Sequence, residues 1–239
     1  MKALILAGGK GSRLQPYTTI IPKPLMPIGD KAILEIVVKQ LKNSGFDEIL
    51  MSIGHLGELI MAFFSDGSKY NVNIKYIKEE KPLGTAGPLS LIKDDLDGPF
   101  LMMNGDVLTD LDYSKLIDYH KKMGNIATVA LNKRVINIDF GVTEINENNQ
   151  IIGYKEKPII DYLVSMGVYI FEERILEYIE DKKYFDLPDL INKLLSNGET
   201  VNGYVFDGYW LDIGRHDDYE RANKEFNEVF DNLMDNKVI

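Results

Sequence analysis

The sequence has no cysteine and only three histidines, His55, His120 and His216, among its 239 residues. The absence of cysteine excludes disulfides and thiolate chemistry, and histidines so far apart do not suggest a local metal cluster, so any metal must use oxygen ligands. No apolar run is close to the length of about 18 residues that is needed to span a bilayer. The first apolar run is interrupted by glycines too early for a signal peptide. We therefore expect a soluble cytoplasmic protein with no membrane partner.

The charge is strongly acidic overall but is unevenly distributed. The formal net charge is -10, which disfavours a nucleic-acid partner, because such proteins bind mainly by neutralising phosphates. The first 29 residues nevertheless contain four cations and no acid: Lys2, Lys10, Arg13 and Lys23. This stretch either attracts a small anion or is a chance run of surface charges, and charge alone favours neither interpretation.

Strand-like runs alternate with helical patterns through the first half of the chain, which predicts an α/β protein. Strands are expected at 2–7, 47–53, 72–77 and 99–103, with helices near 32–43, 56–64 and 113–123. This order predicts a Rossmann-like, doubly wound and predominantly parallel mixed sheet, with ligands at the carboxyl ends of the strands. Shorter strands at 126–132, 140–145, 151–157 and 164–171, with a turn at Asn148-Asn149, predict a small antiparallel lobe inserted into one domain.

A glycine-rich segment, Leu6-Ala7-Gly8-Gly9-Lys10-Gly11-Ser12-Arg13-Leu14, follows the first strand. Glycine lets backbone N–H groups approach an anion closely. The segment is neither a P-loop, which needs Ser or Thr after Gly-Lys, nor a dinucleotide fingerprint, which needs a third glycine and an immediate helix. Prolines at positions 16, 22, 24 and 27 exclude that helix, so we expect the chain to run extended for about fifteen residues and to carry Arg13 and Lys23 across the anion.

The stretch LAGGKGSRLQPYTTIIPKPL closely resembles the signature of the sugar-1-phosphate nucleotidylyltransferases, and the resemblance spans about residues 2–225. It implies an enzyme that transfers a nucleoside monophosphate from a nucleoside triphosphate to a sugar 1-phosphate. By this resemblance, backbone groups of Leu6, Ala7, Gly8, Gly9 and Gly11 contact the nucleotide. Arg13 and Lys23 bind the triphosphate and the departing pyrophosphate, as phosphoryl-type transfer requires fixed cations beside the non-bridging oxygens.

Magnesium is the expected cofactor, because it neutralises triphosphates and prefers carboxylate and phosphate oxygens. Asp106 follows the apolar run at 99–103 and the turn Asn104-Gly105, so it should lie at a strand's carboxyl end. Asp212, within Gly208-Tyr209-Trp210-Leu211-Asp212-Ile213-Gly214, resembles the second metal-binding aspartate of the family. Asp110 and Asp112 are interpreted as loop and helix-cap residues.

The base and the sugar are indicated by three further segments. Leu83-Gly84-Thr85-Ala86-Gly87 resembles the branch that activates mannose 1-phosphate with GTP, so Gly84 and Thr85 are expected to contact guanine. By resemblance, Gly141 of Phe140-Gly141-Val142 contacts the sugar through its backbone, Glu156 accepts bonds from sugar hydroxyls, and Lys157 neutralises the sugar phosphate. Lys155 is interpreted as an ordinary charge of an exposed strand. Ser165 stands where the family has asparagine, which leaves the sugar undetermined.

We therefore predict one catalytic domain over 1–239, with a nucleotide-binding core at about 1–130 and 200–225 and a sugar-binding lobe at about 131–200. No C-terminal β-helix domain is expected. GTP with mannose 1-phosphate or a related hexose or heptose 1-phosphate is the favoured pair. The alternatives are UTP, dTTP or CTP with glucose 1-phosphate or an amino-sugar 1-phosphate, and a non-catalytic subunit that binds a nucleotide sugar. Substrates are small molecules, and the oligomeric state stays open.

Overall fold

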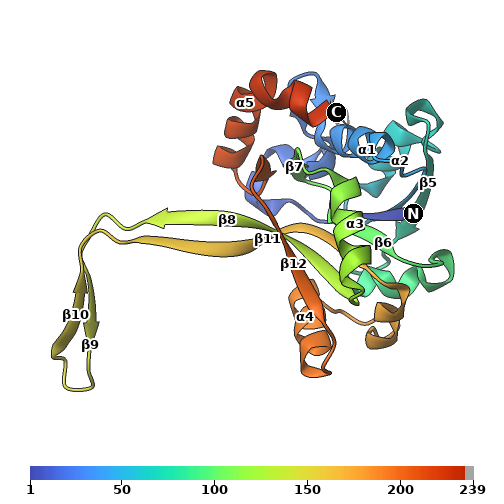
Figure 1. Ribbon diagram of the computed structural model, residues 1–239. Coiled ribbons are helices and arrows are strands. Elements are labelled where there is room, and N and C mark those ends of the chain that lie inside the picture. The colour runs from blue at the N-terminus through green and yellow to red at the C-terminus, as the bar shows by residue number, and fades with distance from the viewer. Residues whose placement is uncertain (235–239) are drawn as a thin grey trace.

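The computed structural model describes residues 1–234, and its centre is a seven-stranded mixed sheet (Figure 1). The strand order is β12-β8-β11-β6-β1-β4-β5, and β11 is the one strand that runs antiparallel to its neighbours. The predicted α/β class with a predominantly parallel sheet is confirmed. The strands are β1 (Lys2–Ala7), β4 (Glu48–Ile53), β5 (Asn73–Lys78), β6 (Phe100–Asn104), β8 (Ala127–Asn137), β11 (Ile159–Phe171) and β12 (Val201–Phe206).

Helices cover both faces of this sheet because its central strands are apolar on both sides. In β1, Ala3 and Ile5 pack into one hydrophobic cluster and Leu4 packs into the other, as the two-residue period of a strand requires. The first cluster includes side chains of α1 (Ile33–Asn43), α2 (Gly57–Phe64) and α3 (Tyr113–Met123). The second includes those of α4 (Leu187–Ser196) and the 3₁₀ segments Gly87–Leu91 and Glu173–Tyr178. The fold is therefore doubly wound, as expected.

A third hydrophobic cluster joins the C-terminal part of the chain to the glycine-rich segment. Helix α5 (His216–Met234) contributes Ala222 and Phe226, which pack with Leu14, Ile28 and Leu211. Two short ladders lie in the same region, β2 (Pro27–Ile28) with β3 (Lys31–Ala32) and β7 (Val107–Thr109) with β13 (Trp210–Asp212). No helix of the described residues is both long and apolar enough to cross a membrane.

The glycine-rich segment differs from the sequence prediction, because it is not extended. Three 3₁₀ turns follow β1 at Ser12–Leu14, Tyr17–Thr19 and Lys23–Leu25. The prolines do exclude an α-helix, but a single tight turn tolerates proline near its start, where no N–H is needed. Pro24 occupies such a position in the third turn. Extended conformation was therefore wrongly inferred from the absence of an α-helix.

The antiparallel insertion is longer and narrower than the sequence suggested. Strand β8 continues to Asn137 and β11 begins already at Ile159, so the two form a ribbon that leaves the body of the molecule (Figure 1). A hairpin of β9 (Val142–Ile145) and β10 (Ile151–Lys155) lies at the far end of this ribbon, turning at Asn149. The second part of the predicted lobe, from about residue 166 onward, instead belongs to the central sheet and α4.

His120 gives the fold a testable pH dependence. Its ring is fully buried, with Nδ1 2.8 Å from Thr128 Oγ1 and Nε2 3.2 Å from Glu172 Oε1. Burial lowers the pKa of His120 below its ordinary value, against an opposing effect of Glu172. A lowered pKa means that the folded state binds this proton less readily than the unfolded chain, so stability is lost as the pH falls below about 6.5.

We expect the free energy of unfolding of the wild-type protein to decrease between pH 7 and pH 5 more steeply than that of a His120→Gln variant. Other titrating groups are common to both proteins, so they cancel in the difference. Denaturant unfolding at several pH values measures it. Parallel pH profiles for the two proteins would show that His120 does not titrate in this way.

Candidate active site

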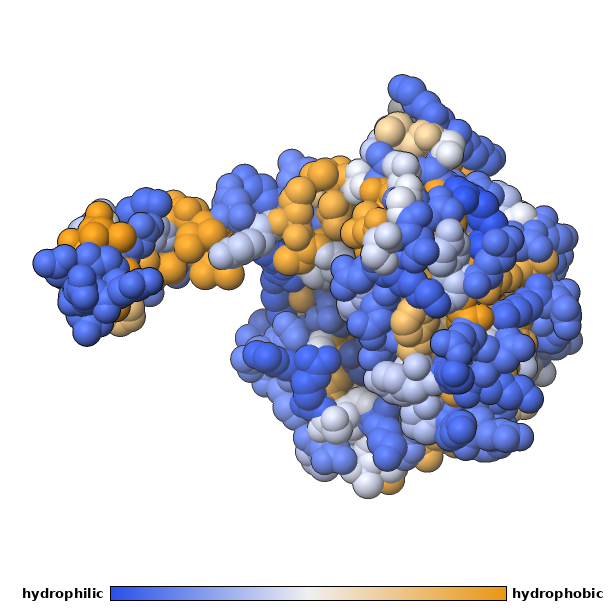
Figure 2. Space-filling model, turned by 90° about the horizontal axis from the view of Figure 1, so that it is seen from below, coloured by the Kyte–Doolittle hydropathy of each residue, from blue (hydrophilic) through white to orange (hydrophobic). Residues whose placement is uncertain are grey.

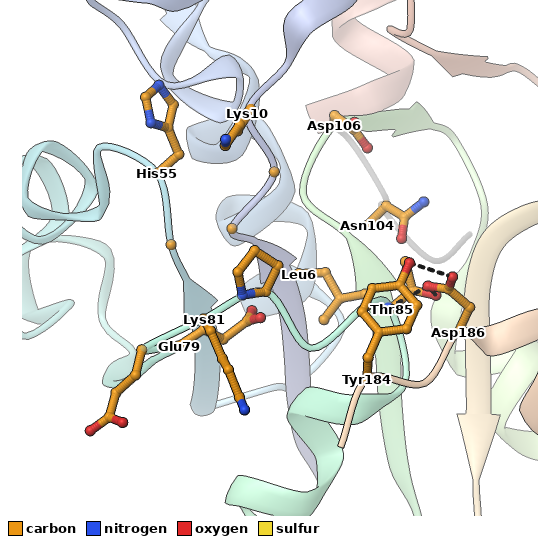
Figure 3. A pocket seen from close by; sticks show the side chains of 16 residues that line it. Leu6, Lys10, His55, Glu79, Lys81, Thr85, Asn104, Asp106, Tyr184 and Asp186 are labelled. Carbon is orange, nitrogen blue, oxygen red and sulfur yellow. Dashed lines mark hydrogen bonds between the residues drawn. The ribbon is translucent and has the colours of Figure 1, made fainter. Parts of the chain in front are cut away.

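A cleft of about 570 Å³ opens at the carboxyl ends of β1, β4, β6 and β5 (Figure 3). It is lined by residues at the ends of these four strands and just after them: Leu6, Gly8, Gly9 and Lys10 at β1, Gly54 and His55 at β4, Asn104 and Asp106 at β6, and Glu79, Glu80 and Lys81 at β5. Ligands bind at this edge of open α/β sheets, so the cleft lies where the fold class predicts a site.

Glycines form the wall of the cleft between β1 and β4 because two backbones meet there. A Cβ on Gly54 would lie 2.7 Å from the carbonyl oxygen of Gly8, and one on Gly8 would lie 3.3 Å from the Gly54 nitrogen. The His55 N–H donates to the same Gly8 oxygen at 3.3 Å. The absence of side chains leaves main-chain groups facing the cleft, which suits close contact with a phosphate or a base.

The 3₁₀ turns place Lys23 beside Asp106. Lys23 is buried, and its Nζ forms an ion pair with Asp106 Oδ2. Gly11, at the N-cap of the first turn, has a left-handed backbone conformation with φ of 59°, and its missing side chain makes room for Thr18 and Lys23. Thr18 in turn donates its hydroxyl to the Gly11 carbonyl at 2.8 Å. Gly11 thus allows Lys23 to pack close to the first turn, and Gly11 itself is not among the residues that line the cleft.

The β7–β13 ladder brings Asp106 and Asp212 together although they are far apart in the sequence. Asp212 pairs with Val107, and the Ile213 N–H donates to the Asp106 carbonyl at 3.2 Å. Burial, and next the charge of Asp106, raise the pKa of Asp212, while the charges of Lys23 and Arg13 act in the opposite direction. Arg13 enters from the glycine-rich segment, and its Nη1 would lie 3.4 Å from a Cβ on Gly214.

These two carboxylates fit a divalent cation. Burial raises the pKa of Asp212 although Lys23 and Arg13 act in the opposite direction, so a bound cation would further stabilise its ionised form. Within residues 1–234 no group of three or more His, Asp or Glu side chains is arranged as a complete metal site. Mg²⁺ commonly uses only one or two carboxylates and completes its octahedron with substrate phosphates and water, so a pair of aspartates is sufficient.

The loop Leu83–Gly87 is held in place by the segment before α4. Asp186 Oδ1 accepts from the Thr85 N–H at 2.9 Å and from the Thr85 hydroxyl at 3.1 Å, and the Leu187 N–H donates to that hydroxyl at 2.7 Å. Gly84 and Thr85 both line the cleft, but the N–H and the hydroxyl of Thr85 are already engaged. Thr85 therefore braces the loop.

Asp186 and Tyr184 were missed from the sequence. In Figure 3 both lie below Asn104 and Asp106, and Tyr184 donates its hydroxyl to Asp186 Oδ2 at 2.7 Å. The pattern Asp186-Leu187-Pro188 is typical of a helix start, and Asp186 does stand at the N-cap of α4, but its carboxylate makes no capping bond there. No local signal indicates that this carboxylate instead holds a loop about one hundred residues away in the chain.

The structure separates the residues expected at the sugar from those expected at the nucleotide. Gly141, Glu156 and Lys157 lie where the ribbon of β8 and β11 meets the β9–β10 hairpin, and none of them lines the cleft. Ser165 lines a different cleft, of about 420 Å³, between the sheet and α4. Ala7 is buried in the hydrophobic core before Gly8 and is not among the residues that line the cleft.

The chain is similar to known proteins over most of its length. The model of the family described as "Nucleotidyl transferase" matches residues 2–229. The UTP–glucose-1-phosphate uridylyltransferase of Synechocystis sp. is 36% identical, over 93% of this chain and 62% of its own length. A probable mannose-1-phosphate guanylyltransferase of rice, Oryza sativa subsp. japonica, is 34% identical, over 92% of this chain and 63% of its own length. The chain thus spans less than two thirds of these relatives.

Similarity to a solved structure extends over the whole chain. The crystal structure of a putative glucose-1-phosphate thymidylyltransferase from Bacillus anthracis, in complex with a sucrose, aligns with a TM-score of 0.77 and 26% identity. The alignment covers 100% of this chain and 97% of that one. The names of these three proteins share one type of group transfer but give three different nucleotides and two different sugars, glucose and mannose.

Proposed function

Because the chain belongs to the nucleotidyl transferase family, we propose that it transfers a nucleoside monophosphate from a nucleoside triphosphate to a sugar 1-phosphate and releases pyrophosphate. One observation carries this proposal. Two cations, Lys23 and Arg13, converge with the carboxylates of Asp106 and Asp212 beside a glycine-walled cleft. Fixed charges of both signs at one edge of the sheet are what phosphoryl-type transfer requires.

In this mechanism a phosphate oxygen of the sugar 1-phosphate attacks the α-phosphorus of the nucleoside triphosphate. The new P–O bond forms as the bond from the α-phosphorus to the bridging oxygen breaks, and pyrophosphate leaves with that bonding pair. Lys23 and Arg13 stabilise the charge that develops on the leaving group. Asp106 and Asp212 would hold a divalent cation, which neutralises triphosphate oxygens. A phosphate monoester with a second pKa of about 6 is already largely dianionic at neutral pH, so no side-chain base is required.

The choice of guanine is supported by the acidic residues that follow β5 at the cleft. Glu79 accepts from the Ser52 hydroxyl and the Leu83 N–H, at 2.7 and 3.0 Å, whereas Glu80 is exposed and is among the residues that line the cleft. Guanine presents adjacent N–H donors at N1 and N2, and a carboxylate accepts two such donors at once. Uracil presents a single donor between two acceptors and would face this carboxylate less favourably. We therefore propose GTP with mannose 1-phosphate or a related hexose or heptose 1-phosphate.

The direct test is pyrophosphate release with Mg²⁺ and a panel of nucleoside triphosphates crossed with mannose, glucose, glucosamine and heptose 1-phosphates. GTP with one mannose-like phosphate should give the highest kcat/KM. Preference for UTP and glucose 1-phosphate would replace the proposed pair with the one named for the Synechocystis relative. Tight binding of a nucleotide sugar without any turnover would instead show a non-catalytic binding subunit.

Lys157 is proposed to bind the phosphate of the sugar substrate, so Lys157→Ala should raise the KM for the sugar 1-phosphate by about 10- to 100-fold, the equivalent of one charged hydrogen bond. The KM for the nucleoside triphosphate should change little. Lys155→Ala is the matched control, because Lys155 lies two residues before Lys157 and carries the same charge but has no assigned role. Equal effects of the two substitutions, or an unchanged KM in Lys157→Ala, would refute this assignment.

A further inference from the structure

The segment between the first and the third 3₁₀ turn depends on the rest of the chain for its shape. We call residues 15–27 the proline loop, because four of them are prolines, which donate no backbone N–H. Its 3₁₀ turns are short and separate, so no extended ladder of hydrogen bonds holds it. The ribbon of β8 and β11, which Figure 2 shows with hydrophobic patches along the projection, is also exposed, but its two strands hold each other by a ladder.

Helix α5 binds both ends of the proline loop. His216 Nε2 lies 2.9 Å from the Gln15 carbonyl oxygen, and the Tyr219 hydroxyl donates to the Pro27 carbonyl at 2.7 Å. A carbonyl oxygen only accepts, so His216 carries a proton on Nε2 and donates it. The Tyr17 ring packs against both side chains, with ring centres 5.8 Å from His216 and 6.2 Å from Tyr219. We call the two hydrogen bonds from α5 the neck of the loop.

The neck brings together two points that are far apart along the chain. His216 and Tyr219 are three residues apart in α5 and therefore lie on one face of the helix. The carbonyl groups that they bind, those of Gln15 and Pro27, are twelve positions apart in the sequence. Fixing the two ends of a loop in this way removes much of its conformational freedom. The neck therefore restricts every residue between them.

The same face of α5 continues the contact beyond the neck. Asn223 Oδ1 accepts from the Gly29 N–H at 3.3 Å. Gly29 has a left-handed backbone with φ of 59°, and a Cβ there would lie 2.3 Å from the Phe226 ring, so only glycine fits. The contacts at positions 216, 219, 223 and 226 follow the period of a helix. Helix α5 therefore runs along the segment and holds it over several turns.

The proline loop carries Lys23, whose Nζ pairs with Asp106 at the cleft. Lys23 is buried, but Ile20 and Ile21 on the outer side of the loop are exposed, and the side chain of Ile20 is 72% accessible. Packing thus does not cover the loop as a whole. The position of Lys23 depends on how firmly the two ends of the loop are held.

The start of α5 is joined to the second proposed metal-binding carboxylate. The helix begins four residues after Asp212, and Asp218 Oδ2 accepts from the N–H groups of Gly214 and Arg215 at 3.2 and 2.9 Å. The Arg13 guanidinium lies beside Gly214 in the same turn. One helix is therefore connected both to the carboxylate of Asp212 and to the loop that carries Lys23.

We propose that His216 and Tyr219 are positioning residues, which close the proline loop and thereby hold Lys23 where it meets the triphosphate and the leaving pyrophosphate. This inference rests on the proposed function. Neither residue is among those that line the cleft, so both act through the loop. With the neck broken, the loop has to be ordered again whenever a triphosphate binds, and this ordering weakens binding.

Hydrogen exchange of the free protein, followed by mass spectrometry, tests the closure without any ligand. In the double variant His216→Leu/Tyr219→Phe, the amides of residues 17–26 should exchange about tenfold faster than in wild type, while those of β1 and β6 keep their rates. Arg221→Ala is the matched control, because Arg221 donates to Glu225 Oε1 at 2.7 Å on the same helix, outside the neck. Unchanged exchange in the loop, or equal acceleration in Arg221→Ala, overturns the proposal.

Calorimetric titration with inorganic pyrophosphate and Mg²⁺ tests the effect on the cations. The double variant should bind pyrophosphate about tenfold more weakly than wild type. Tyr219→Phe keeps the ring and loses only the hydroxyl, so it should show a smaller loss, and it replaces the double variant if that protein does not fold. His216→Gln keeps an N–H donor and should bind nearly as wild type does. In steady state the loss should appear in the KM for the nucleoside triphosphate, with the KM for the sugar 1-phosphate unchanged.

The two measurements separate failure of this inference from failure of the proposed function. Equal pyrophosphate affinity of wild type and of the neck variants overturns the positioning role, even where the loop exchanges faster. If wild type itself binds no pyrophosphate and makes no nucleotide sugar, the proposed function fails, and the exchange rates alone decide whether α5 closes the loop.

Discussion

Replacing Asp106 with asparagine should lower kcat by about 10³-fold while leaving the protein folded. Asparagine has the same shape but no charge, so the substitution removes the partner of Lys23 and one of the two carboxylates proposed to hold the divalent cation. Steady-state pyrophosphate release measures the effect, and circular dichroism with thermal unfolding verifies the fold. Near-normal turnover would exclude Asp106 from the reaction.

Asp112→Asn is the matched control for this experiment. Asp112 lies six residues further on and accepts from the N–H groups of Ser114 and Lys115, at 3.0 and 3.3 Å, as the N-cap of α3. Asparagine is an equally good N-cap, so this variant should retain both its stability and its turnover. A comparable loss in both variants would indicate a general sensitivity of the β6–α3 connection, independent of the chemistry assigned to Asp106.

Replacing Lys23 with alanine should lower kcat/KM by about 10²- to 10³-fold. The Lys23 side chain is buried against Asp106, so its loss leaves the carboxylates of Asp106 and Asp212 without a neighbouring cation. It also removes one of the two cations proposed to bind the leaving pyrophosphate. The half-buried Lys31, which pairs with the exposed Asp30 at 2.6 Å, is the control: Lys31→Ala also removes a Lys–Asp ion pair and should leave kcat/KM unchanged. Equal rates for Lys23→Ala and wild type would remove Lys23 from the mechanism.

The predictions from sequence succeeded where a local pattern determines structure. Alternating apolar segments are sufficient to predict the α/β sheet, and Asp106 could be placed because it directly follows a buried strand and a turn. Asp112 was assigned to a helix cap by the same reasoning, and its bonds to Ser114 and Lys115 confirm it. The position of Asp212 depended on family resemblance, because its contact with Asp106 arises from a ladder between strands about one hundred residues apart.

The remaining features depend on contacts or conformations that local patterns do not specify. Asp186 resembles a capping residue by its position, and only the folded structure shows that it holds Thr85. The 3₁₀ turns were missed because proline excludes an α-helix without excluding a single tight turn. The full length of β8 was missed because Val135 and Ile136 are adjacent apolar residues, which do not alternate as in a half-buried strand. The predicted strand therefore ended before them.

The fate of the triphosphate phosphorus atoms, followed by ³¹P NMR, tests the proposed reaction most directly. With GTP, mannose 1-phosphate, Mg²⁺ and the purified protein, the account predicts that the α-phosphorus appears in a sugar-linked diphosphate while the β- and γ-phosphorus atoms appear together as pyrophosphate, in equal amounts. If another pair in the panel is preferred, the same test applies to that pair. Formation of a nucleoside diphosphate and inorganic phosphate, with the sugar 1-phosphate unchanged, would contradict nucleotidyl transfer by this site.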